Sequence, residues 1–139
     1  MSRVLPRTTV PQLRVSTLSG EDFDLHTTQP EHYILVVFYR GYHCPVCKIY
    51  IQDLDKKLSR FQDLGVEVIA VTSNDEHLAR SSQEEWGIQN LNIGYGLSIA
   101  DARNWGLYIS SGIPEMNEPN QFSEPGLFIV DSDKKLYAS

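Results

Sequence analysis

The sequence has only two cysteines among its 139 residues, and its longest run of purely apolar side chains, residues 34–38, is short. A membrane-spanning helix needs about 20 apolar residues. Residues 1–10 also lack the apolar stretch of a secretory signal. Positive charge is in deficit, with 12 Lys and Arg against 18 Asp and Glu and a formal net charge of -6. The sequence therefore predicts neither a membrane nor a nucleic-acid partner.

The length and the 41% hydrophobic content suffice for one core, so a single domain over residues 1–139 is expected. Without a secretion signal, the reducing cytoplasm is the default location. In that compartment a close pair of cysteines is more often catalytic or metal-binding than structural.

Strands are predicted wherever apolar and β-branched residues cluster between turn-forming residues. The first two form an N-terminal hairpin around Ser19-Gly20-Glu21. The central two read as parallel strands joined by a helical crossover, because both are apolar at nearly every position. The predicted strands are 13–18, 23–25, 33–39, 66–72, 97–100, 127–131 and one beginning at Leu136.

A long amphipathic helix is predicted between the two central strands, ending at Gly65. Its mostly apolar stripe consists of Val46, Ile49, Tyr50, Asp53, Leu54, Lys57, Leu58, Phe61 and Leu64. A second helix is expected from a capping box of Ser73 and Glu76 to Trp86, with Gly87 after it. Asp101 is expected to cap a short helix through Trp105, and both tryptophans are expected to anchor the core.

Residues 110–123 are polar and contain Pro114 and Pro119, so a surface loop is predicted there. The acidic residues in and beside it, Glu115, Glu118 and Glu124, are interpreted as a solvated surface.

The candidate site is Cys44-Pro45-Val46-Cys47, at the junction of strand 33–39 and the long helix. A cysteine at a helix cap faces unpaired backbone N–H groups and the positive end of the helix dipole, and both favour the thiolate. Pro45 fits the first helical turn, where its missing N–H costs nothing. Cys44 is therefore predicted to be the exposed nucleophile.

Cys47 lies one turn further along the same face, where it can attack Cys44 once that sulfur is oxidised or joined to a substrate. It is predicted to be the more buried, resolving thiol. Arg40, His43 and Lys48 are nearby groups whose positive charge would favour the thiolate further.

Two structural alternatives remain open from the residues alone. Both cysteines can be inert core residues. They can also supply half of a zinc site, although the histidines, His26, His32, His43 and His77, lack the paired spacing that would complete it. No metal and no cofactor are predicted.

The chain resembles the peroxiredoxin-like branch of the thioredoxin-like superfamily, related to alkyl hydroperoxide reductase and thiol-specific antioxidant. The likeness runs through the hairpin around Gly20, the strand Val36 to Tyr39 with Arg40-Gly41 and the cysteine pair, residues 66–73, and Pro125 to Asp131. It implies an α/β fold with a mixed central sheet flanked by helices. It also implies that Pro125 is a cis-proline opposite Cys44.

The resemblance implies that Cys44 reduces a hydroperoxide, that Cys47 resolves the sulfenic acid as a disulfide, and that a thioredoxin- or glutathione-like thiol donor restores both. Three departures stand out. Val37 and Gly41 occupy the places of the family's proline and its threonine or serine, and Pro125 replaces its arginine. Arg40 is the candidate substitute for that arginine.

Adjacent cysteines also resemble thioredoxin-type reductases, and the departures leave room for a non-catalytic redox-sensing module. Relatives continue beyond the final hairpin into a strand and a helix that cover one sheet face. The expected C-terminal strand and helix are thus cut short, and uncovered sheet surface favours a homo-oligomer.

Overall fold

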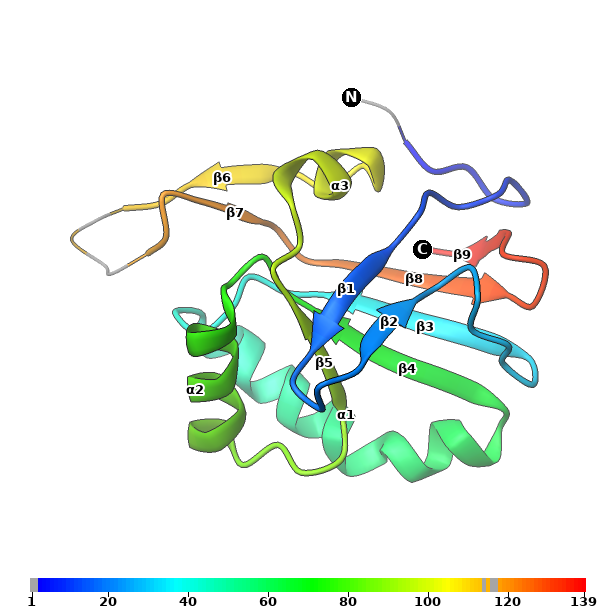
Figure 1. The fold of residues 1–139 in the computed structure, drawn as a ribbon, viewed down its shortest axis with the longest axis horizontal. Coiled ribbons are helices and arrows are strands. Elements are labelled where there is room, and N and C mark those ends of the chain that lie inside the picture. The colour runs from blue at the N-terminus through cyan, green and yellow to red at the C-terminus, as the bar shows by residue number, and fades with distance from the viewer. Residues whose placement is uncertain (1–2, 114, 116–117) are drawn as a thin grey trace.

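The computed structural model describes residues 3–113, 115 and 118–139, and its centre is a seven-stranded mixed sheet (Figure 1). Strand order across the sheet is β2-β1-β5-β4-β3-β8-β9. The inner strands β3, β4 and β5 run parallel, whereas β8 lies antiparallel to β3. The strands are β1 (Arg14–Thr17), β2 (Asp22–Asp24), β3 (Tyr33–Phe38), β4 (Val66–Val71), β5 (Asn92–Tyr95), β8 (Gly126–Asp131) and β9 (Leu136–Ala138).

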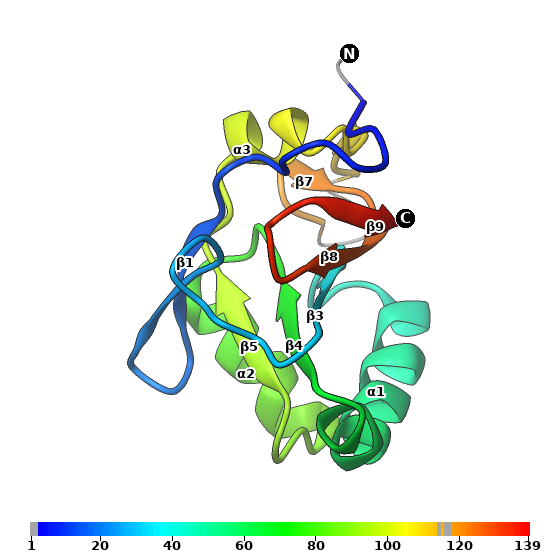
Figure 2. The ribbon, with the colours of Figure 1, turned by 90° about the vertical axis from the view of Figure 1, so that its right-hand side faces the viewer.

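Each face of the sheet carries its own hydrophobic core, because alternate residues of β3 and β4 point to opposite sides. One core packs against α1 (Pro45–Asp63) and α2 (Glu76–Trp86), and Leu35 and Val37 belong to it. The other packs against α3 (Ile99–Asn104) and the N-terminal segment, and it includes Val36 and Phe38. Figure 2 shows α1 and α2 together on one side of the sheet and α3 on the other. The α/β fold with helices flanking a mixed sheet and an N-terminal hairpin is as predicted.

The buried face of α1 agrees with the predicted stripe only in part. Cys47, Ile51 and Leu58 are buried, whereas Val46 and Ile49 are each 68% exposed. The helix carries apolar residues on both sides of the face that is buried. Their spacing alone therefore does not show which of them pack against the sheet. Tyr50, Leu54 and Phe61 were placed correctly and pack partly buried against the core.

Two predicted helix caps are wrong, and in both cases a side chain two or three residues away caps the helix instead. Asp75, not Ser73, caps α2, because its carboxylate accepts a hydrogen bond from the Leu78 N–H at 2.9 Å. Ser98, not Asp101, caps α3 by accepting from the Asp101 N–H at 3.0 Å. The strand predicted at 97–100 is therefore absent, and the strand in this region is β5.

The predicted loop at 110–123 contains a two-stranded sheet of β6 (Ile109–Ser111) and β7 (Gln121–Ser123). Phe122 on β7 is buried, so this hairpin packs against the body of the protein. Pro114 lies outside the described residues. Both tryptophans are core residues, as expected, with Trp86 and Trp105 6% and 1% exposed. No helix among the described residues is long and apolar enough to span a membrane.

Candidate redox site

The first cysteine sits where β3 hands over to α1. Cys44 is the N-cap of α1, in extended backbone conformation with φ −104° and ψ 106°, and Pro45 begins the helix, as predicted. The Cys44 sulfur accepts a hydrogen bond from the Cys47 N–H at 3.3 Å. The sulfur therefore lies at the positive end of the helix dipole, with a backbone N–H directed at it.

The second cysteine lies in the first turn of the same helix. Cys47 is 1% exposed and Cys44 is 8% exposed, so Cys47 is the more buried thiol, as predicted, but the prediction that Cys44 is exposed is wrong. Both are free. Burial raises the pKa of Cys47 to about 11, and the neighbouring Cys44 thiol acts in the same direction. The Tyr50 hydroxyl opposes this by donating a hydrogen bond to the Cys47 sulfur at 3.5 Å.

The turn before Cys44 is held from the end of β4. The Thr72 hydroxyl donates to the Arg40 carbonyl at 3.2 Å, and the Tyr42 N–H donates to the Asn74 side-chain oxygen at 2.9 Å. Gly41 has φ +135°, and a Cβ at this position would overlap the Asn74 amide. This turn therefore requires glycine at position 41, because it has no room for a side chain that would carry a hydroxyl.

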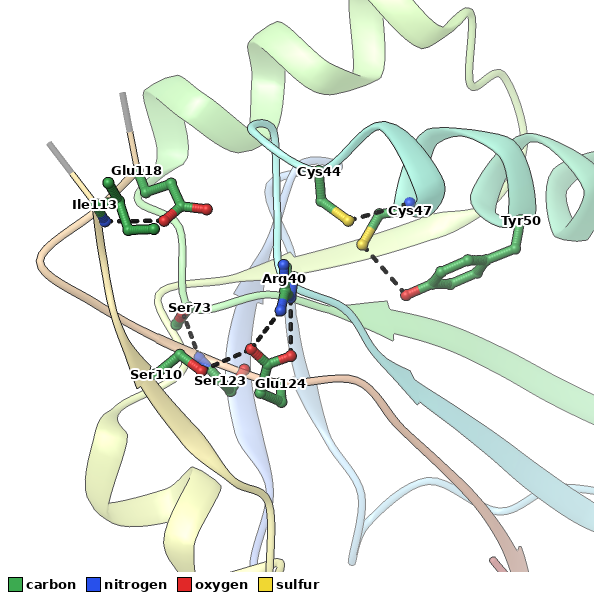
Figure 3. A network of polar contacts seen from close by, with 10 residues as sticks. All are labelled: Arg40, Cys44, Cys47, Tyr50, Ser73, Ser110, Ile113, Glu118, Ser123 and Glu124. Carbon is green, nitrogen blue, oxygen red and sulfur yellow. Dashed lines mark hydrogen bonds and ion pairs between the residues drawn. The ribbon is translucent and has the colours of Figure 1, made fainter. Parts of the chain in front are cut away.

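Arg40 is fixed by a partner 84 residues away in the sequence (Figure 3). Its Nε and Nη2 donate to the two carboxylate oxygens of Glu124, both at 2.8 Å. Ser110 donates to the same carboxylate at 2.7 Å, and the guanidinium lies over the Phe122 ring, 5.4 Å from its centroid. Arg40 is therefore oriented by contacts from the β6–β7 hairpin and the segment after it.

Electrostatics tie this ion pair to the thiols. The pKa of the Arg40 guanidinium is raised, chiefly by its hydrogen bonds to Glu124, and the charges of Cys44 and Cys47 add to the rise. The same hydrogen bonds lower the pKa of Glu124. The interpretation of Glu124 as a solvated carboxylate is therefore wrong, since its side chain is only 19% exposed.

His43 does not supply positive charge to the thiols. Burial lowers its pKa, so the imidazole is neutral near pH 7. Its ring packs edge-on against Phe122 with centroids 4.6 Å apart, and both ring nitrogens are buried without a hydrogen-bond partner among the described residues. Lys48 is exposed on α1. Of the three cationic candidates, Arg40 is the one whose raised pKa includes a contribution from the charges of the two cysteines.

The prediction of a cis-proline is wrong. Every peptide bond among the described residues is trans, including that before Pro125. Pro125 is exposed and follows Glu124, whose N–H donates to the Tyr108 carbonyl at 2.8 Å. The contribution of this segment to the site comes from Glu124 instead.

Two residues of the site were missed by sequence reasoning. Glu124 carries no local signal, because its partner lies on a distant segment. Tyr50 did carry one, since it lies three residues after Cys47 and such residues are neighbours on a helix. No group of three or more His, Cys, Asp or Glu in the described part of the chain is placed to hold a metal ion.

The sequence matches the AhpC/TSA family over residues 6–139. Alkyl hydroperoxide reductase C of Amphibacillus xylanus is 30% identical over 123 residues, which cover 86% of this chain and 62% of that protein. The chain thus spans less than two thirds of the length of this relative.

Solved structures of peroxiredoxins have the same fold at low sequence identity. The peroxiredoxin-like protein from Aquifex aeolicus has a TM-score of 0.79 and 16% identity, and the comparison covers 99% of this chain and 76% of that one. Reduced Prx3 from Vibrio vulnificus, solved in complex with hydrogen peroxide, has a TM-score of 0.79 and 12% identity over 97% of this chain and 85% of its own. Both show the thioredoxin-like fold predicted from the sequence.

Proposed function

Because this chain belongs to the AhpC/TSA family, we propose that it is a thiol peroxidase that reduces hydroperoxides through Cys44 and resolves the product with Cys47. The family match and the similar folds of the solved structures confirm the resemblance to the peroxiredoxin-like branch. The observation that carries the proposal is the pair itself. Cys44 caps α1 and accepts the Cys47 N–H, and Cys47 occupies the turn that follows.

The proposed cycle has three steps. The Cys44 thiolate attacks one peroxide oxygen, the O–O bond breaks, and the sulfenic acid forms as the alcohol or water takes up a proton. Cys47 then attacks that sulfur, which forms the Cys44–Cys47 disulfide and releases water. An external dithiol reduces the disulfide and returns both thiols.

Arg40 is proposed to support the first step. Its guanidinium is held by Glu124, and the charges of both cysteines contribute to its raised pKa. A positive charge near the cysteines would offset the negative charge that develops on the departing oxygen. The neutral His43 is proposed to shape the site beside Phe122.

The test is hydrogen-peroxide consumption with a dithiol donor, compared with Cys44→Ser and Cys47→Ser. We expect no turnover above background for Cys44→Ser. Cys47→Ser should retain the first, single-turnover step while losing the intramolecular disulfide. Mass spectrometry of alkylated protein before and after one equivalent of peroxide should show the loss of two thiols in the wild type. Peroxide consumption equal to that of Cys44→Ser would remove the peroxidase proposal.

A general disulfide reductase is the second candidate, and the spacing of the two cysteines favours it. Both sulfurs lie in one helical turn, and the more exposed of the two is at the helix N-terminus. Reduction of insulin disulfides, followed by turbidity, separates the two activities. A protein that turns over in neither assay, yet forms the disulfide, would be a redox sensor.

The finer features of the setting are also proposals. A thioredoxin- or glutathione-like donor fits the required exchange, and a reducing cytoplasm would keep the two thiols free. The seven-stranded sheet contains strands from near both ends of the chain, including β1 and β9, which supports a single domain.

A homo-oligomer is proposed from apolar exposure on the edge strand β9 and its neighbour β8, where Tyr137 and Leu127 are 62% and 50% exposed. Sedimentation velocity of the wild type and of a Leu127→Ser, Tyr137→Ser variant tests this. A monomeric wild type would contradict it.

A further inference from the structure

Opening of a Cys44–Cys47 disulfide raises a charge problem at Cys47. When an external thiolate attacks Cys44, the sulfur of Cys47 must leave with the bonding electron pair and hence with a negative charge. This sulfur lies in an apolar core beside residues such as Ile51, and Cys47 is 1% exposed. Water therefore contributes little to stabilising the departing thiolate.

Tyr50 is placed to meet this charge. It lies three residues after Cys47 on α1, half-buried in the same core, and its hydroxyl donates to the Cys47 sulfur at 3.5 Å (Figure 3). Burial raises the pKa of Tyr50, and the hydrogen bond to Cys47 raises it further. The phenol therefore keeps its proton, and can donate it in a hydrogen bond, near pH 7.

The Arg40 backbone also hydrogen-bonds to Cys47 and acts to lower its pKa, but no other side chain takes this role in the described part of the chain. The Tyr39 hydroxyl is buried and makes no hydrogen bond to Cys47 in the part of the chain that the structure describes. Arg40 directs its guanidinium to Glu124. Cys44 is bonded to Cys47 in the oxidised form and carries the incoming thiol during the step. Tyr50 is thus the side-chain donor that the described structure shows on this sulfur.

We propose that Tyr50 is a catalytic residue of the reductive step, stabilising the Cys47 thiolate as the disulfide opens. The inference rests on the proposed function only in requiring that the Cys44–Cys47 disulfide forms and is reduced. The external thiolate forms a bond to the Cys44 sulfur, the Cys44–Cys47 bond breaks, and its electron pair passes to Cys47. The phenolic O–H strengthens its hydrogen bond to that charge, and Cys47 then takes a proton from solvent.

The test compares Tyr50→Phe with Tyr95→Phe. Tyr95 is also half-buried against the same core, and its hydroxyl has no hydrogen bond recorded in the described structure, which makes it a matched control. The disulfide is formed with diamide, so no peroxide is needed. Its opening by excess dithiothreitol is then followed by quenched alkylation. A hydrogen bond to a charge that is half developed in the transition state corresponds to roughly three- to tenfold in rate.

We therefore expect Tyr50→Phe to slow opening roughly three- to tenfold and Tyr95→Phe to stay within about twofold of the wild type. A second readout uses Cys44→Ser, in which Cys47 is the remaining thiol. There, Tyr50→Phe should shift the pH profile of Cys47 alkylation upward by about one unit. A purely structural role would lower the unfolding midpoint without moving this profile.

Failure of this inference is distinguishable from failure of the peroxidase proposal. Equal opening rates for Tyr50→Phe, Tyr95→Phe and the wild type would overturn the role of Tyr50 and leave peroxide reduction untouched. Absence of peroxide consumption would remove the peroxidase while the diamide comparison still stands. If diamide forms no Cys44–Cys47 disulfide, the role of Tyr50 is refuted outright.

Discussion

The ion pair between Arg40 and Glu124 predicts a specific dependence of stability on pH. A hydrogen bond to a charged group contributes about 1.5–3 kcal/mol when buried, and an exposed ion pair about 0.2–1 kcal/mol. The Arg40 side chain is 37% exposed and that of Glu124 is 19% exposed, so this pair lies between the two limits. After allowance for solvent screening of Arg40, we expect Glu124→Gln to lower the free energy of unfolding at pH 7 by about 1–2 kcal/mol.

The sign of the pH dependence follows from the lowered pKa of Glu124, which its hydrogen bonds to Arg40 cause. Below its usual value of about 4.3 the unfolded chain binds a proton that the folded protein resists. The contribution of the pair is therefore fully present above about pH 5 and is lost as the pH falls through the folded-state pKa. The difference between wild type and Glu124→Gln should shrink on acidification.

Urea denaturation at a series of pH values measures this difference. Glu67→Gln is the control, because Glu67 is an exposed carboxylate on β4, and we expect a change within about 0.5 kcal/mol. A double-mutant cycle with Arg40→Met isolates the pairwise term. The reasoning is refuted if Glu124→Gln is as stable as the wild type at pH 7, or if its deficit does not change between pH 7 and about pH 3.

Three further outcomes test the packing of the site and its helices. Gly41→Thr adds the family's hydroxyl but should destabilise the protein by about 2 kcal/mol or more and gain no peroxide consumption, because φ is +135° and the side chain meets Asn74. Activity above wild type would contradict this. Leu58→Ala should cost about 2–5 kcal/mol in urea denaturation, whereas Leu64→Ala at the C-cap of the same helix should cost under about 0.5 kcal/mol, since the two are 7% and 68% exposed. Asp75→Ala should lower the unfolding free energy by about 1 kcal/mol through loss of the α2 cap, and no change in the urea midpoint would argue against that cap.

Features fixed by short stretches of sequence were predictable. The junction of β3 and α1, the cap at Cys44, the position of Pro45 and the order of burial of the two thiols all follow from residues within one turn of each other. The parallel strands β3 and β4 were equally clear, because both are apolar at most positions.

Features that depend on distant partners were not predictable. The sequence does not show that Glu124 binds Arg40, because only the fold brings the two together. It also does not show that Asn74 occupies the space in which a side chain at Gly41 would lie. Asn92–Tyr95 carries only a weak strand pattern, and it becomes β5 because β1 and β4 pair with it on either side.

The placement of both sulfurs within one turn of α1 has a mechanical consequence. Side chains three residues apart on a helix are already neighbours, so the bond between them closes a short ring without drawing separate segments together. Oxidised and reduced forms are then expected to share one backbone, and the redox state would be displayed only as a local change around the start of the helix. A macromolecule that distinguishes the two forms therefore has to contact the start of α1, where the two sulfurs lie.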